Sequence, residues 1–155
     1  MADDTSGTGG LDAENVALGE ALAAAHAAVW GYGVVGAALG EGANSTAAAA
    51  ETAHRDARDR VTALLVERKT EPVGAKGGYA LPFPVLSQAD AAALAVVLED
   101  GVAAAWVRVL DQAAERSTRE LAVTALGDAE VRAVSWRTAA GKSPATSPFP
   151  GLPAE

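Results

Sequence analysis

The chain of 155 residues contains no cysteine, which excludes disulfide bonds, thiolate zinc sites and catalysis by a thiol. Aromatic residues make up only 5% of the sequence, and β-branched residues other than valine are scarce. By contrast, 50% of the residues are hydrophobic, and alanine is the largest share of them. Because alanine has the highest intrinsic helix propensity, this composition favours an all-α protein. The length fits one domain with a substantial core.

Positively charged residues are also few. Lysine and arginine total 12 against 20 aspartates and glutamates, and the arginines are scattered rather than gathered in a patch. With a net charge of −8, the chain is expected to bind neither nucleic acid nor an anionic membrane surface. The first residues are acidic and lack the basic and apolar regions of a signal peptide, so we expect a cytoplasmic location.

One stretch, residues 21–40, contains no Asp, Glu, Lys or Arg and has about the length of a membrane span. It is mostly alanine and glycine, however, and it includes His26. Glu20 and Glu41 flank it, where a membrane helix usually carries lysine or arginine. We therefore predict a buried bundle helix with no role in a membrane.

Apolar residues recur at steps of three and four along most of the chain, which is typical of helices in a bundle. This period predicts four helices, over residues 11–39, 44–69, 87–114 and 117–140. The third begins with Ser87 and Asp90 at the spacing of a capping box, and the fourth with Ser117 and Glu120.

The connections between these helices differ in length. Residues 70–86 are rich in proline and glycine, lack periodicity and cannot be helical. Such a segment can span roughly 50 Å when extended, whereas a helix of about 25 residues is near 38 Å long. The lengths predict two antiparallel hairpins joined by a long crossover between the second and third helices, which is the ferritin-like connectivity among four-helix bundles.

The expected organisation is therefore a bundle over residues 11–140 with a segment outside it at each end. Residues 1–10 are polar, and we expect them to form a disordered leader. Residues 141–155 form a proline-rich tail, which either packs on the bundle or stays loose.

Glu51 and His54 stand three residues apart on the second predicted helix, so their side chains lie one turn apart. Helix bundles build dinuclear iron or manganese sites from this Glu-x-x-His unit, used twice, together with single glutamates from two other helices. Glu130 on the fourth helix has the same placement as Glu51, and Glu99 lies beside the core line of the third. These four residues are the candidate metal ligands.

The whole helical region resembles a ferritin-like bundle, and in particular the small uncharacterised ferritin-like domain proteins of actinobacteria. The segments that carry the resemblance are residues 26–36 (HAAVWGYGVVG), 54–55 (HR), 79–82 (YALP) and 149–152 (FPGL). Di-iron members of this fold carry a glutamate seven residues before a tyrosine on the first helix, then Glu-x-x-His, Glu, and a second Glu-x-x-His. By this resemblance, positions 51, 54, 99 and 130 match, whereas Ala25 and Ala133 stand where ligands are expected.

These two alanines predict a degenerate di-metal site and a protein without catalytic residues or cofactor, acting as a structural or interaction module. One alternative is an iron- or manganese-binding oxidase or storage protein that uses the four remaining ligands. A further alternative is a small-ligand binder with a core cavity lined by Ala25, Tyr32 and Ala133.

Each candidate ligand also has a purely structural interpretation. Glu51 is placed to pair with Arg55, four residues on. His54 is placed to pair with a core carboxylate, and Tyr32 to donate its hydroxyl to one. Glu99 and Glu130 are ordinary carboxylates or partners of arginines, Arg58 and Arg132 among them. Asp128 and Arg132, also four residues apart, predict a separate ion pair.

Trp30 and Trp106 lie beside the core lines of their helices. Exposed tryptophans at the flank of a bundle suggest a self-association surface, so we expect a homodimer. The alternative is that they pack against the long connection or the tail.

Overall fold

The computed structural model describes residues 5–42 and 44–153. Within these ranges the chain forms four helices and no strand: α1 (Thr5–Leu39), α2 (Asn44–Glu67), α3 (Gln88–Gln112) and α4 (Arg116–Ala139). The predicted all-α, four-helix architecture is confirmed. The predicted leader is shorter than expected, because α1 already begins at residue 5, and residues 1–4 lie outside the described part of the chain.

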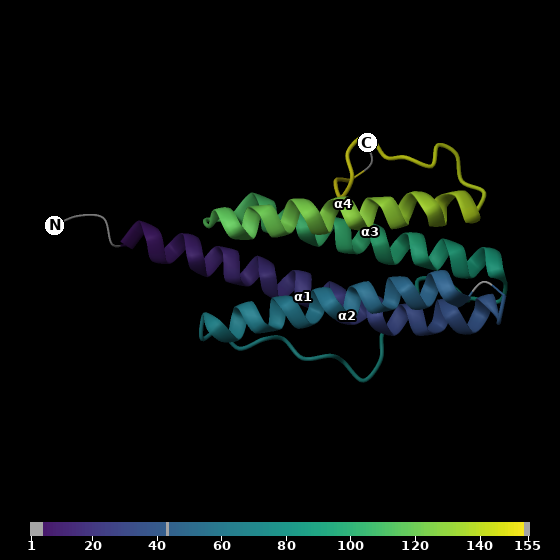
Figure 1. Ribbon diagram of the computed structural model, residues 1–155, viewed down its shortest axis with the longest axis horizontal. Coiled ribbons are helices and arrows are strands. Elements are labelled where there is room, and N and C mark those ends of the chain that lie inside the picture. The colour runs from purple at the N-terminus through teal and green to yellow at the C-terminus, as the bar shows by residue number, and fades with distance from the viewer. Residues whose placement is uncertain (1–4, 43, 154–155) are drawn as a thin grey trace.

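The helices pack side by side along most of their length (Figure 1). α1 contacts both α2 and α3, and α3 contacts α4. At one end of the bundle the Gln88 side chain donates to the Leu39 carbonyl at 3.0 Å, so α3 begins where α1 ends. At the other end Glu14 of α1 accepts hydrogen bonds from the turn between α3 and α4. α1 and α3 are therefore antiparallel neighbours at the centre of the fold.

The core is built from alanine and a few large side chains, among them Trp106, Trp136, Tyr32, Leu18 and Leu22. Small residues let helices pack closely, and Gly31 is an example. A Cβ added at Gly31 on α1 would lie 2.7 Å from both terminal methyl groups of Leu98 on α3. This contact gives a packing reason for a glycine that costs about 1 kcal/mol inside a helix.

The tryptophans differ in environment. Trp106 is buried, with 3% of its surface exposed, and it belongs to the core. The prediction that it lies at an exposed flank is therefore wrong, because α3 is covered on more sides than its apolar period suggested. Trp30 is half-buried and packs against Tyr79, with ring centroids 5.7 Å apart.

The starts of α3 and α4 show one correct prediction and one error. The Ser87 hydroxyl accepts from the Asp90 amide at 3.1 Å, which confirms the predicted cap. The capping box predicted at Ser117 is wrong. α4 begins one residue earlier, its N-cap Glu115 makes no side-chain cap bond, and Thr118 donates its hydroxyl to Glu14 instead.

Two irregular segments lie against the bundle on opposite sides (Figure 1). Residues 68–87, between α2 and α3, run along its length, and His26 Nε2 on α1 lies 3.1 Å from the Val73 carbonyl oxygen. The tail after α4 is packed rather than loose. Arg137 donates to the Ala145 carbonyl at 3.0 Å, and a Cβ added at Gly151 would lie 2.7 Å from the Ala103 carbonyl oxygen.

By length and composition, one stretch of the described residues qualifies as a candidate membrane span. This is Gly9–Leu39 of α1, and 39% of the most apolar 18-residue window within it is buried inside the structure. A core helix passes the same test, and α1 packs between α2 and α3 here.

Candidate functional site

The four helices meet at Glu99, which projects from the middle of α3 and is fully buried. Each of the other helices sends one donor to the same oxygen, Glu99 Oε1. The Tyr32 hydroxyl of α1 donates at 2.5 Å, and Nε2 of His54 on α2 lies at 2.9 Å. Nε of Arg132 on α4 donates at 3.0 Å. We call these four residues the Glu99 cluster.

The second oxygen of this carboxylate is treated differently. Glu99 Oε2 is buried and has no hydrogen-bond partner among the described residues. Buried polar atoms in proteins are nearly always paired, and an unpaired one costs about 1–3 kcal/mol. Within the Glu99 cluster, Oε1 therefore accepts from three donors, whereas Oε2 has none among the described residues.

The protonation states in the cluster follow from its charges. Burial raises the pKa of Glu99, but the hydrogen bond and charge of His54 and the guanidinium of Arg132 outweigh burial and hold the pKa below its ordinary value. Glu99 is therefore ionised at neutral pH. Burial and the negative Glu99 raise the pKa of Tyr32 far above its ordinary value, so the hydroxyl stays protonated and donates. Since an ionised carboxylate only accepts, His54 must carry a proton on Nε2.

Aromatic packing fixes the same residues in place. The Tyr32 and His54 rings are stacked with centroids 5.4 Å apart, and Trp136 lies 6.2 Å from Tyr32. Ala25 and Ala133, predicted to line a cavity with Tyr32, are both buried.

The predicted metal ligands do not come together. Only His54 and Glu99 are in contact. Glu51 accepts from Arg55 at 2.5 Å, as its structural interpretation required, and Glu130 accepts from Arg137 at 2.8 Å. Among the residues with described positions, no group of three or more His, Asp or Glu side chains is arranged to hold a metal ion.

Arg132 decides whether a metal centre fits. The sequence offered it two kinds of partner, Asp128 four residues away or one of the glutamates Glu99 and Glu130, and its guanidinium reaches the buried Glu99 carboxylate. A dinuclear centre of the kind implied by the resemblance needs carboxylates and imidazoles converging from all four helices. Here a permanent cation contacts the central carboxylate, and alanine occupies two ligand positions. The donor set therefore does not fit a di-iron or di-manganese centre.

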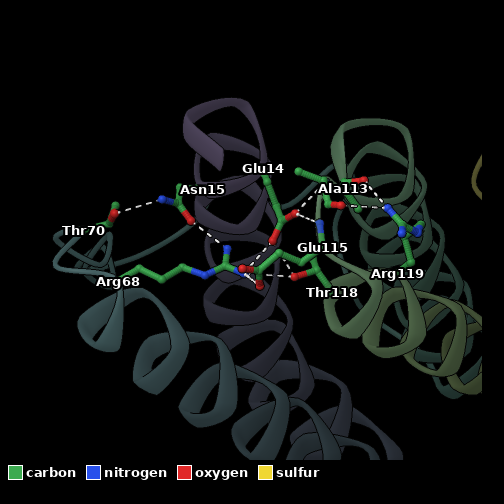
Figure 2. A network of polar contacts seen from close by, with 9 residues as sticks. Glu14, Asn15, Arg68, Thr70, Ala113, Glu115, Thr118 and Arg119 are labelled. Carbon is green, nitrogen blue, oxygen red and sulfur yellow. Dashed lines mark hydrogen bonds and ion pairs between the residues drawn. The ribbon is translucent and has the colours of Figure 1, made fainter. Parts of the chain in front are cut away.

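A second buried carboxylate, Glu14, was missed by the sequence analysis (Figure 2). It accepts from the backbone amides of Ala114 and Glu115 at 2.6 and 2.8 Å and from the Thr118 hydroxyl. Glu14 thus caps the start of α4 from a different helix. The available signal was its register, because Glu14 stands four residues before Leu18 on the core line of α1.

Arg68, just after α2, completes this second network (Figure 2). It pairs with Glu14 and Glu115, both at 2.6 Å, and donates to the Asn15 side chain at 2.8 Å. Burial raises the pKa of Glu14, but the bonds from Thr118, the Glu115 amide and Arg68 bring it below its ordinary value. Glu14 is therefore an ionised, fully bonded clamp that ties α1, α4 and the end of α2 together.

Comparison with known proteins places the chain in a family. A family described as a domain of unknown function, DUF4439, matches residues 17–154. The chain belongs to the DUF4439 family. A solved structure of a conserved hypothetical protein from Mycobacterium tuberculosis is 42% identical, with a TM-score of 0.79. That alignment covers 82% of this chain and 96% of the mycobacterial one.

Neither the description of the DUF4439 family nor that of the mycobacterial protein states an activity, and no curated protein matches the chain. The DUF4439 match contains the whole Glu99 cluster and the packed tail, whereas Glu14 lies just before it. The site must therefore be interpreted from its own chemistry.

Proposed function

We propose that this DUF4439 protein is a ferritin-like bundle in which a protein hydrogen-bond network has replaced the metal centre, and that it serves as a non-catalytic structural or interaction module. The observation that carries the proposal is Glu99 Oε1 accepting from Tyr32, His54 and Arg132 at 2.5, 2.9 and 3.0 Å. The long connection between α2 and α3, flanked by two short turns, supports the ferritin-like assignment.

The chemistry of the cluster supports a structural role. Arg132 supplies the positive charge that a metal ion supplies to the carboxylates of a di-metal protein. A guanidinium has no redox chemistry and no exchangeable coordination position. The cluster instead joins all four helices through one oxygen, which favours a single rigid packing.

The remaining expectations belong to the same proposal. With a net charge of −8, the module acts on a protein partner, with nucleic acid and anionic lipid excluded by charge. The partner we propose is a second copy of the chain, in the cytoplasm.

Metal content tests this proposal against the rival hypothesis of an iron or manganese oxidase or storage protein. The protein is purified from cells grown with excess iron and manganese, and metal per chain is measured by mass spectrometry. His54→Ala removes the imidazole of the cluster. His26→Ala is the matched control, because His26 is the other histidine of the chain and lies against Val73 of the long connection.

We expect much less than one metal ion per chain in all three proteins. One or more ions per chain in the wild type and in His26→Ala, lost in His54→Ala, would overturn the proposal and support the rival.

A further inference from the structure

A groove separates α2 from α4, which do not pack closely on each other although both belong to the bundle. Its volume is about 270 Å³, and Trp106 of α3 lines it between the two walls. Each wall is one stripe of a helix at positions i, i+3, i+4 and i+7, from Ala53 to Arg60 on α2 and from Leu121 to Asp128 on α4. We call this feature the α2–α4 groove.

Trp106 brings to this groove a hydrogen-bond donor that the protein leaves unused. Only 3% of the residue is exposed, and a buried tryptophan usually finds a partner for its N–H. The Trp106 Nε1–H has no acceptor among the described residues, and Glu99 Oε2 is the only side-chain polar atom there that is both enclosed and unpaired. Nε1 therefore reaches the surface, and the surface that Trp106 lines is the α2–α4 groove. Because an indole N–H donates and cannot accept, it calls for a ligand with an acceptor.

The charged side chains of the α2 wall are also unused. Asp56 and Arg60 lie four residues apart, which is the spacing of the Glu51–Arg55 ion pair on the same helix. Within the described part of the chain, Asp56 and Arg60 form no ion pair with each other or with any other residue, and both are exposed. A carboxylate and a guanidinium on this wall are thus available to a ligand.

The α4 wall adds a second available carboxylate. Asp128 stands four residues before Arg132, but the Arg132 guanidinium turns to Glu99 in the core. Asp128 is exposed and has no ion-pair partner among the residues that the structure describes. The contact that completes the Glu99 cluster therefore leaves Asp128 free at the groove.

The acceptors and the donors occupy different levels of the groove. The Glu99 cluster joins α2, α3 and α4 and fixes their register, and α4 runs antiparallel to the other two. At 1.5 Å per residue, Asp56 and Asp128 lie about 3 and 6 Å along the bundle from the cluster, whereas Arg60 and Trp106 lie about 9 and 10 Å from it. Negative charge thus lies at one level, and donors for an anion lie at the next.

We propose that the α2–α4 groove binds a short zwitterionic peptide, with the peptide ammonium group on Asp56 and Asp128 and its carboxylate on Arg60 and the Trp106 Nε1–H. A dipeptide spans at most about 7 Å between its ends, which matches the separation of the two levels, whereas a single amino acid is about half as long. Alanine and leucine on the walls leave room for apolar side chains. The groove is slightly smaller than the roughly 300–1,000 Å³ of pockets for drug-sized ligands, which limits the peptide to about this length.

Two other grooves lack this combination. The groove beside Trp30 and Tyr79 has no charged lining residue. In the groove under the tail, the charges of Asp100 and Arg137 are already paired at 2.6 Å. Neither offers a zwitterion two free charges of opposite sign.

Binding of the dipeptide L-alanyl-L-leucine to the full-length protein tests the proposal, followed in proton–nitrogen correlation NMR spectra. The 3 tryptophans give separate indole N–H signals. We expect the Trp106 signal to move and to saturate with a Kd of about 1 mM or lower, while those of Trp30 and Trp136 stay in place. The N-acetylated and the C-terminally amidated dipeptides each lack one charge and should bind at least about tenfold more weakly.

Variants of the groove test the assigned contacts. Arg60→Gln and the double variant Asp56→Asn with Asp128→Asn should each raise the Kd at least about tenfold. Ala57→Leu fills the groove without adding charge and should abolish binding. Asp59→Asn is the matched control, because Asp59 is an exposed carboxylate of α2 outside the groove, and it should keep the wild-type Kd. Circular dichroism confirms that each variant is folded.

An unmoved Trp106 signal at about 10 mM dipeptide, tenfold above the expected Kd, would overturn the proposal. Equal Kd values for the wild type and a folded Arg60→Gln protein would do the same. So would a blocked dipeptide, or free leucine, that binds as tightly as the dipeptide. Such a failure would leave the proposed metal-free module standing, since the α2–α4 groove shares no residue with the Glu99 cluster.

Discussion

Glu14 and Glu99 are both fully buried glutamates held by an arginine, yet the protein satisfies their oxygens in different ways. Both oxygens of Glu14 are bonded, one to two backbone amides and the other to Thr118 and Arg68. Glu99 concentrates three donors on Oε1 and leaves Oε2 without a protein partner.

The difference is the one expected if the fold requires Glu14 and if, as proposed above, the Glu99 cluster stands where a metal centre stood. Glu14 bonds two backbone amides beside the start of α4, those of Ala114 and Glu115. Glu99 bonds only side chains, at the position where the ferritin-like resemblance expects a metal ligand. An unpaired oxygen beside a neutralising arginine is what we expect when protein donors take over a carboxylate that once bound metal.

Removing the charge of Glu14 should have the largest effect. Glu14→Gln turns an amide group toward backbone donors and leaves Arg68, only 13% exposed, without its buried anion. We expect the free energy of unfolding to fall by about 3–5 kcal/mol, measured by urea denaturation.

The control for this variant is Glu115→Gln, which removes the other carboxylate paired with Arg68. Glu115 is 46% exposed, and the expected loss is below about 1 kcal/mol. Equal losses in the two variants would show that Glu14 is not the clamp.

Glu99→Gln should cost less, about 1–3 kcal/mol, because Arg132 is 24% exposed and can turn toward solvent. Glu51→Gln is its control, since Glu51 is the predicted metal ligand that pairs with Arg55 at the surface, and its loss should stay within about 0.5 kcal/mol. If Glu99→Gln proves more damaging than Glu14→Gln, the ranking of the two sites is reversed.

Glu130, a third predicted ligand, accepts from Arg137 and from the Ser147 amide of the tail. Loosening the tail should have a smaller effect on stability. Gly151→Ala combines a left-handed φ of 77° with a clash against the Ala103 carbonyl, and should cost about 1–2 kcal/mol and expose the tail to proteases. Gly141→Ala is the control, because its φ of 70° is similar but the added methyl group meets open space. Similar protease sensitivity in both variants would show that tail packing does not depend on the Gly151 contact.

Acid sensitivity should give the smallest difference. The pKa of each buried glutamate is lower in the folded protein than its ordinary value of 4.5, so the folded state binds fewer protons than the unfolded one. The stability they contribute is present above about pH 4.5 and is lost as the pH falls through the lower folded values. Between pH 6 and 3, the free energy of unfolding measured in urea should fall less steeply in Glu14→Gln and in Glu99→Gln than in the wild type. Parallel profiles in the three proteins would contradict these pKa shifts.

The sequence predicted most of the fold, and for the cluster it predicted the kind of partner that each residue takes but left alternatives open. The period of apolar residues located four helices, and local spacing correctly paired Glu51 with Arg55. The position of Tyr32 on the core line of its helix also predicted that its hydroxyl donates to a carboxylate, which proves to be that of Glu99. These features depend on contacts within a turn of helix or on burial, which periodicity reports directly.

The remaining contacts depend on how helices are placed relative to one another. The sequence left Arg132 a choice between Asp128 and the glutamates Glu99 and Glu130, and in the structure it pairs with the buried Glu99 rather than with the exposed Asp128. The cap of α4 comes from Glu14, about a hundred positions away in sequence. Local rules cannot rank such partners, because the deciding desolvation exists only after the helices have packed.

Anomalous diffraction tests the central claim most directly. Crystals of the wild-type protein grown with manganese or iron would be measured at the absorption edge of the metal. We predict no anomalous peak between His54 and Glu99, with Arg132 Nε remaining within hydrogen-bond distance of Glu99, as at 3.0 Å here. A peak bonded to both side chains, with the Arg132 guanidinium displaced, would contradict the account.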